Sequence, residues 1–216
     1  MSSIKRIWIV SEYTRGNQNS TGYFWEKLID HFQAKGLEVK VITVANSDKK
    51  PKGSSIIERV VSKTVTAVRL ARAVLKNVQK GDVVFSGTNP ESLLFLLALL
   101  KKIKVFRWNV LVHDVFPENL ISAKITDENR LGYRIIKSVF DWVYSQPSKL
   151  FVIGRDMKLL VDEKTGKPEK SHFIPNWVDS EAIVPKKKNE SEIIKNLGWQ
   201  EKTVFQFFGN IGRVQG

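Results

Sequence analysis

The sequence predicts an α/β fold, a doubly wound, Rossmann-like parallel sheet with helices on both faces. The first observation is an apolar strand at residues 6–12, a helix at 21–35 that Gly36 ends, and an alternating strand at 37–44. The second is that short apolar runs continue to alternate with helical periodicity along the chain. A strand, a helix and a second strand in succession imply parallel pairing. The helix carries the chain back to the end of the sheet where the first strand began, so the second strand runs in the same direction.

The remaining elements complete this fold. Further strands are expected at 83–86, 105–112, 150–153 and 172–174, separated by helices at 57–79, 90–101 and 130–145. Six strands suffice for a complete doubly wound domain, which we assign to residues 1–184.

A linker and the start of a second domain follow. Pro185 and the lysines after it break the periodic pattern, so residues 185–200 are interpreted as an interdomain linker with a short helix at 192–197. Residues 201–216 are expected to begin a truncated second domain, whose first strand lies at 203–208.

The composition excludes several classes of protein. The chain has 216 residues, enough for one α/β domain and a piece of another, and is 42% hydrophobic and 26% charged, as in soluble globular proteins. No apolar run approaches the roughly 18 residues that a membrane span needs. Cysteine is absent, which excludes disulfides and thiolate metal sites, and the amino terminus lacks a signal-peptide pattern. We therefore expect a cytoplasmic location and no metal.

The chain is strongly basic. Its 35 Lys and Arg residues against 22 Asp and Glu residues give a net charge of +13, which attracts nucleic acid, anionic lipid or phosphorylated substrates. Nucleic acid is disfavoured, because the basic residues lack interleaved aromatic residues and no known nucleic-acid-binding pattern accompanies them.

The helix at 57–79 carries much of this charge. Its apolar residues recur at intervals of three and four, which predicts a buried stripe of Ile57, Val61, Thr64, Val68, Ala71, Leu75 and Val78. Basic residues are expected to face away from this stripe, namely Arg59, Lys63, Arg69, Arg72 and Lys76. They form either an ordinary solvated helix face or a surface that lies against an anionic membrane.

The loop after the first strand is a candidate binding site, because ligands of doubly wound sheets bind beyond the carboxyl ends of the strands. Tyr13, Arg15, Asn17 and Asn19 can hydrogen-bond a sugar, and we interpret them as acceptor-binding residues. Gly22 allows a ligand to approach the backbone closely. The alternative is that this segment only caps the following helix.

A second candidate site is the segment LVHDVFPEN at residues 111–119. His113 and Asp114 follow an apolar strand and are the candidate catalytic residues, because a histidine there can exchange a proton or bind a sugar hydroxyl. Glu118 is a candidate acceptor contact. The alternative for His113 is a purely structural role.

The last ten residues, FFGNIGRVQG, form a third candidate site. Gly212 permits close approach of an anion to backbone N–H groups, and Arg213 offers a planar fork of donors that suits a diphosphate. A tight turn without a ligand is the alternative. The segment IPNWVD at residues 174–179 is interpreted as a turn between domains.

In this order, these segments and FVIGRDM at 151–157 resemble the amino-terminal half of a GT-B glycosyltransferase of family 4, a group that builds bacterial surface polysaccharides such as lipopolysaccharide and capsule. The resemblance implies retaining transfer of a sugar from a nucleotide-sugar to a lipid-linked or oligosaccharide acceptor, at the inner face of the cell membrane and without a cofactor. It implies that His113 faces the donor sugar and that Gly22, Gly212 and Arg213 bind its diphosphate. The sequence departs from common family patterns at Tyr23 and Trp177, where relatives often carry glycine.

Three functions remain open. In the first, the chain is a fragment of a retaining glycosyltransferase. The donor then binds mostly beyond Gly216, so the 216-residue chain alone is expected to be inactive. In the second, the chain is a noncatalytic acceptor-binding or membrane-docking subunit of a two-chain glycosyltransferase. In the third, it belongs to another doubly wound enzyme such as a sugar-phosphate epimerase.

Overall fold

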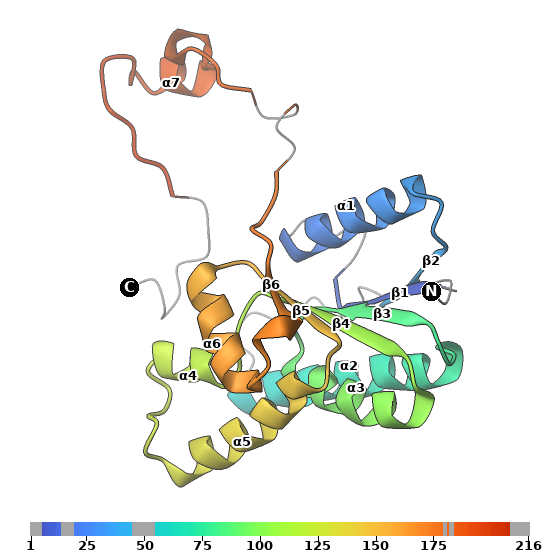
Figure 1. The fold of residues 1–216 in the computed structure, drawn as a ribbon. Helices are drawn as coiled ribbons and strands as arrows, with labels where there is room; N and C mark the ends of the chain where they lie inside the picture. Colours follow the sequence, from blue (N-terminus) through green and yellow to red (C-terminus); the bar gives the residue numbers. More distant parts are fainter. Residues whose placement is uncertain (1–5, 14–19, 45–54, 179–180, 182–183, 208–216) are drawn as a thin grey trace. The chain divides into compact units, whose positions relative to one another are not determined.

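The six predicted strands all form and make one parallel sheet (Figure 1). The structure is a computed structural model that describes residues 6–13, 20–44, 55–178, 181 and 184–207. The sheet order is β2-β1-β3-β4-β5-β6, and every neighbouring pair is parallel. The strands are β1 (Ile7–Val10), β2 (Val39–Ile42), β3 (Val83–Ser86), β4 (Arg107–Val112), β5 (Lys149–Val152) and β6 (Ser171–Phe173). The predicted α/β, doubly wound fold is confirmed.

Helices cover both faces of this sheet. They are α1 (Ser20–Ala34), α2 (Ile56–Asn77), α3 (Glu91–Lys104), α4 (Glu118–Ser122), α5 (Leu131–Ser145) and α6 (Arg155–Thr165), and a 3-10 turn at Pro168–Lys170 precedes β6. Figure 1 shows α1 on one face, and α2, α3 and α5 on the other. Strand β2 is added on one side of β1, and β3 and the later strands are added on the other side. The strand order therefore reverses between β1 and β3, at the switch point where doubly wound sheets bind ligands.

The side chains of β1 point alternately to the two faces of the sheet and contribute to a hydrophobic cluster on each face. Ile7 and Ile9 pack with Trp25 and Ile29 of α1, whereas Trp8 and Val10 belong to the larger cluster on the opposite face. All four strand residues are buried. A strand that buries consecutive residues needs cover on both sides, which explains its continuous apolar sequence.

Helix α2 begins with a capping box. Ser55 Oγ accepts a hydrogen bond from the Glu58 backbone N–H at 3.2 Å, and the Glu58 carboxylate accepts one from the Ser55 N–H at 2.9 Å. The predicted buried stripe of this helix is confirmed at Ala71 and Val78 but wrong at Val61, Thr64 and Leu75, which are exposed.

The buried apolar side of α2 consists of Ala67, Leu70, Ala71 and Val74, and the buried Val78 directly follows the helix. Apolar residues occur on more than one side of this helix, so periodicity alone did not determine which side packs. Two alanines on the buried side leave room for α3 to approach closely.

Two helices were missed. Helix α4 has five residues, too few to show a period, and α6 buries Lys164 and Thr165 alongside Val161, so its buried side does not look apolar in the sequence.

The chain divides into two compact units, Met1–Pro175 and Asn176–Gly216. The second contains a 3-10 turn at Lys188–Glu190 and α7 (Glu192–Asn196), which Ser191 caps. The strand predicted at 203–208 is not formed over residues 203–207, the part that the structure describes. A strand needs a neighbour for its backbone hydrogen bonds, and the described part of this unit contains none. The domain boundaries expected at residues 184 and 200 stay predictions.

Candidate functional site

The carboxyl ends of β1, β3 and β4 bring polar residues together. The Asn89 side-chain amide, beyond β3, donates to the Glu12 carboxylate, beyond β1, at 3.2 Å. The Asp114 backbone N–H, beyond β4, donates to Thr88 Oγ1 at 3.4 Å. These contacts tie together three loops at the edge of the sheet where the switch point lies.

His113 is half-buried at this edge. Its ring stacks on Phe24 of α1 with centroids 6.0 Å apart. Its Nε2 atom is buried and has no hydrogen-bond partner among the described residues. Burial lowers the pKa of His113, and the neighbouring Asp114 carboxylate only partly offsets this effect. The ring is therefore neutral at pH 7 and its Nε2 can either accept or donate a hydrogen bond.

A pocket of about 330 Å³ opens beside His113. Its polar lining consists of His113, Asp114, Glu118, Asn119, Ser122 and Asp156. Asn119 Oδ1 is also buried without a partner in the described part of the chain. Carboxylates, an amide and a hydroxyl offer acceptors and donors that suit a ligand rich in hydroxyl groups.

Asp156 enters this pocket from the first turn of α6. Its Oδ1 atom lies 2.5 Å from where a Cβ would stand at residue 154, so a side chain at this position would displace the Asp156 carboxylate. Neither Asp156, Asn119 nor Ser122 was singled out from the sequence. The apolar strand followed by Gly-Arg-Asp in FVIGRDM is the signal that could have found Asp156.

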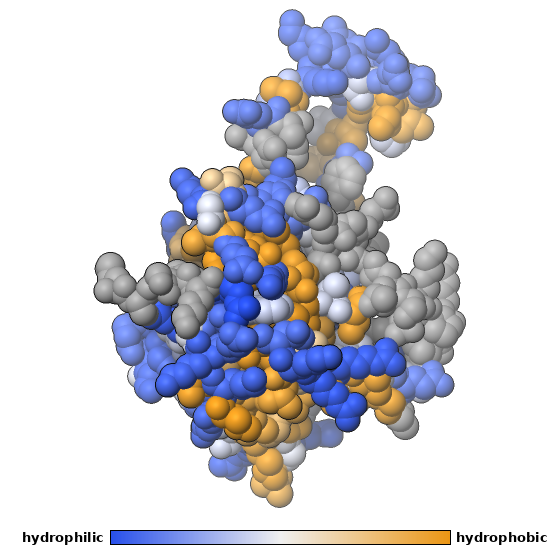
Figure 2. Space-filling view, turned by 90° about the vertical axis from the view of Figure 1, so that its right-hand side faces the viewer, coloured by the Kyte–Doolittle hydropathy of each residue, from blue (hydrophilic) through white to orange (hydrophobic). Residues whose placement is uncertain are grey.

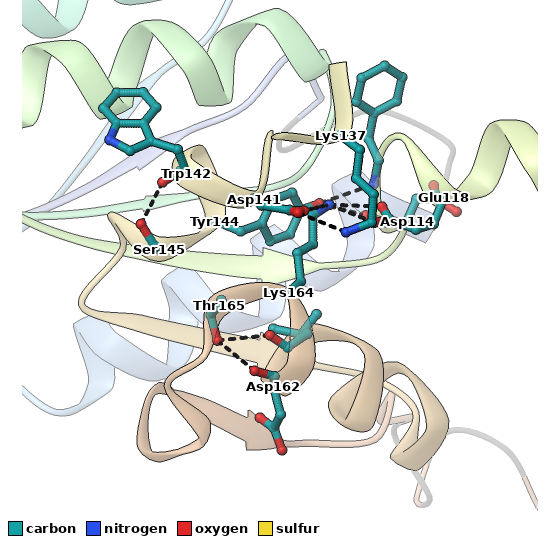
Figure 3. Close-up of polar contacts among 12 residues, drawn as sticks. Asp114, Glu118, Lys137, Asp141, Trp142, Tyr144, Ser145, Asp162, Lys164 and Thr165 are labelled. Carbon is teal, nitrogen blue, oxygen red and sulfur yellow. Dashed lines mark hydrogen bonds and ion pairs between the residues drawn. The ribbon is translucent and has the colours of Figure 1, made fainter. Parts of the chain in front are cut away.

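A buried lysine, Lys164, contacts Glu118, which lines this pocket (Figure 3). Lys164 Nζ donates to both Glu118 oxygens, at 2.7 and 3.0 Å, and to Asp141 Oδ1 at 2.6 Å. Its side chain is only 1% exposed. Lys137 also pairs with Asp141, at 2.8 Å, and with Glu118, at 3.7 Å. Two ammonium groups thus balance two carboxylates, and we call these four residues the Lys164 cluster.

Tyr144 connects the same region to the catalytic candidates (Figure 3). Its hydroxyl donates to the Asp114 backbone oxygen at 3.2 Å and accepts from the Phe116 N–H at 3.4 Å. Burial raises the pKa of Tyr144, so the hydroxyl keeps its proton. The loop at 114–118 is therefore held by Tyr144 in its middle and by Lys164 at its end.

The structure places the other predicted residues differently. Glu118 lines the pocket, but its carboxylate is engaged by Lys164. Tyr13 is half-buried, and burial with the nearby Glu12 carboxylate raises its pKa. Gly22 is buried in the first turns of α1. Arg15, Asn17, Asn19, Gly212 and Arg213 lie outside the described residues.

The predicted membrane-facing residues lie on α2. Arg59, Arg69, Arg72 and Lys76 are exposed, whereas Lys63 pairs with Glu91 of α3 at 3.1 Å. No helix in the described ranges is both long and apolar enough to cross a membrane. Nor do these ranges contain a group of three or more metal-ligating side chains.

A doubly wound sheet with a polar pocket at the carboxyl ends of its strands defines an α/β protein of the kind that binds nucleotides or sugars. The family described as Glycosyltransferase Family 4 matches residues 22–182, so the chain belongs to glycosyltransferase family 4. The predicted resemblance to the amino-terminal half of a GT-B enzyme of this family is confirmed.

One similar protein is "Probable glycosyltransferase WbjE" of Pseudomonas aeruginosa, which is 37% identical over 228 residues. The match covers 98% of this chain but 57% of WbjE, so the chain spans little more than half of that relative.

Among solved structures, Anabaena Alr3699/HepE in complex with UDP matches with a TM-score of 0.50 and 11% identity, over 90% of this chain and 50% of that one. The same protein in complex with UDP-glucose matches with a TM-score of 0.49 and 14% identity, over the same shares. At such low identity the likeness shows the fold alone.

Proposed function

We propose that this chain provides the acceptor-binding half of a retaining glycosyltransferase that takes its sugar from a nucleotide-sugar. The acceptor is a lipid-linked sugar or an oligosaccharide in the synthesis of a cell-surface polysaccharide. The observation that carries this proposal is the polar pocket beside His113, in a chain that belongs to glycosyltransferase family 4. The naming of WbjE as a probable glycosyltransferase and the UDP complex of HepE support a nucleotide-sugar donor.

The proposed roles follow from chemistry and position. A neutral His113 hydrogen-bonds the donor sugar through Nε2, and Asp114 orients a hydroxyl at the mouth of the pocket. Tyr13, Arg15, Asn17, Asn19 and Glu118 are the proposed acceptor-side residues.

Gly22, Gly212 and Arg213 are proposed to bind the diphosphate. Gly22 stands near the amino terminus of α1, where the helix dipole favours an anion. Arginine stabilises the charge that develops on a departing diphosphate. No metal or further cofactor is required in this proposal, and the enzyme acts in the cytoplasm, peripherally at the inner face of the cell membrane.

The decisive experiment is transfer of a labelled sugar by a full-length protein that contains this sequence, assayed with a panel of nucleotide-sugars. His113→Ala should lower kcat about tenfold, because a hydrogen bond contributes about 1.4 kcal/mol, which corresponds to about a factor of ten in rate. His172→Ala is the matched control. His172 is also half-buried, has a buried Nε2 without a described partner and contacts an aromatic ring, but it lies on β6.

Equal effects of the two histidine substitutions would contradict the role of His113. We expect the 216-residue chain alone to give no donor-dependent turnover, and a robust rate from it would overturn that expectation. Recovery of activity only on addition of a separate polypeptide would favour the two-chain alternative.

A further inference from the structure

A second concave surface lies between α2, α3, α4 and α5. It is a groove of about 630 Å³ with a mainly apolar lining that includes Val60, Val68, Phe95, Leu120, Ile136 and Val139. The lining also contains Lys63 and Glu91, which form an ion pair with each other.

The walls of this groove are open to solvent. Val60 is 58% exposed, Ile136 41% and Phe95 37%. Figure 2 shows that hydrophobic surface elsewhere on the molecule also emerges between hydrophilic residues, but scattered exposed apolar residues need no partner. A groove with an apolar lining differs from scattered apolar residues, because several of its side chains can surround one ligand.

The groove and the polar pocket lie on opposite sides of one short segment. Phe116 and Leu120, four residues apart, line the groove. Val115, Asn119 and Ser122 of the same segment line the polar pocket. A ligand with a polar head and an apolar tail could therefore occupy both by crossing this segment.

The helices around the groove are strongly basic. Together α2, α3 and α5 carry ten Lys and Arg residues against three carboxylates, Glu58, Glu91 and Asp141. Such an excess of positive charge attracts an anionic ligand. An apolar groove between helices of net positive charge matches the chemistry of a lipid whose hydrocarbon chain is joined to a phosphate or diphosphate.

We propose that this groove binds the hydrocarbon chain of a lipid-linked acceptor, whose sugar enters the pocket beside His113. The assignment of the head group rests on the proposed function, whereas binding of the chain rests on the groove itself. The structure thereby favours a lipid-linked acceptor over a free oligosaccharide.

The test is calorimetric titration of the 216-residue chain with inorganic diphosphate, geranyl diphosphate and farnesyl diphosphate, each below its micelle concentration. Each buried methylene strengthens binding by about fourfold, so farnesyl diphosphate should bind at least tenfold more tightly than geranyl diphosphate. Equal affinity for inorganic diphosphate and farnesyl diphosphate would overturn the proposal.

Two neighbouring isoleucines of α5 provide the matched variants. Ile136→Asp places a carboxylate in the groove and should weaken farnesyl diphosphate at least tenfold, whereas Ile135→Asp should change its affinity less than twofold. Ile135 is 57% exposed and is not part of the lining, so both variants should fold, which circular dichroism checks. Equal effects of both variants would contradict the groove.

Other occupants give different results. If Ile136→Asp abolished sedimentation with anionic vesicles but left farnesyl diphosphate binding intact, a bilayer lipid would replace the acceptor chain and the proposal would fail. If the same substitution only converted a dimer into a monomer, the groove would be an interface between copies. Ile136→Asp could weaken farnesyl diphosphate binding while His113→Ala leaves sugar transfer unchanged. That result would contradict the proposed function but support the groove as a binding site.

Discussion

Two regions of the first unit each bury a charged side chain, and they use it for different ends. Asp82 is fully buried at the start of β3 and accepts hydrogen bonds from Trp8 Nε1, from the Gln79 N–H, both at 2.9 Å, and from Arg6 at 3.4 Å. Lys164 is buried among the carboxylates of Glu118 and Asp141. Both charges are paired, as buried charges must be.

The partners differ in what they touch. Those of Asp82 join the starts of β1 and β3 to the end of α2, at the opposite ends of the strands from His113. Glu118, the partner of Lys164, lines the polar pocket and closes the loop that carries Asp114. One buried charge therefore stabilises the sheet, and the other positions the candidate site.

Replacing Lys164 should have the largest effect. Lys164→Met leaves the Glu118 and Asp141 carboxylates with Lys137 as their one ion-pair partner among the described residues, so the free energy of unfolding should fall by about 3 kcal/mol. Sugar transfer by the full-length protein should also fall, since the loop at 114–118 loses its anchor. Urea denaturation measures the first effect and the transfer assay the second.

Lys158→Met is the matched control on the same helix. Lys158 pairs with Asp162 at 2.6 Å, but its side chain is 33% exposed, and such pairs contribute about 1 kcal/mol or less. If the two lysine variants proved equally stable and equally active, the distinction between a buried anchor and a surface pair would be wrong.

Removing the other buried charge should affect stability alone. Asp82→Ala removes the acceptor of the Trp8 Nε1–H and Gln79 N–H donors. The free energy of unfolding should therefore fall by about 2 kcal/mol. Affinity of the folded chain for farnesyl diphosphate should remain unchanged. Weaker binding by the folded variant would show that the two regions are coupled and that Asp82 does not act on stability alone.

Much of the sheet could be predicted from the sequence because its strands are short apolar runs with cover on both faces. Periodicity was insufficient where the buried side of a helix is not purely apolar. In α6 that side includes Lys164, and in α2 the apolar residues occupy more than one side.

The candidate site was predicted only in part. His113 and Asp114 could be found because they directly follow a strand, and their catalytic roles stay predictions. The pairing of Lys164 with Glu118 and Asp141 joins residues 46 and 23 positions apart, and no local pattern encodes such contacts. Asn119 and Asp156 enter the pocket from α4 and α6, the two helices that the sequence did not reveal.

His113 should contribute a small pH dependence to the free energy of unfolding. Burial lowers the pKa of His113 in the folded chain, so the unfolded chain takes up the proton first as the pH falls. This contribution to stability is fully present above the ordinary histidine pKa of about 6.5 and is lost as the pH falls through the lower, folded value.

Urea denaturation at several pH values between 7.5 and 5 measures this loss. His113→Ala should reduce it, whereas Asp82→Ala should lower stability while leaving the histidine contribution in place, because Asp82 lies at the other ends of the strands. NMR titration of the His113 ring gives an independent check. A pKa at or above 6.5 would mean that burial does not keep the ring neutral, and the proposed hydrogen bond from a neutral His113 to the sugar would have to be abandoned.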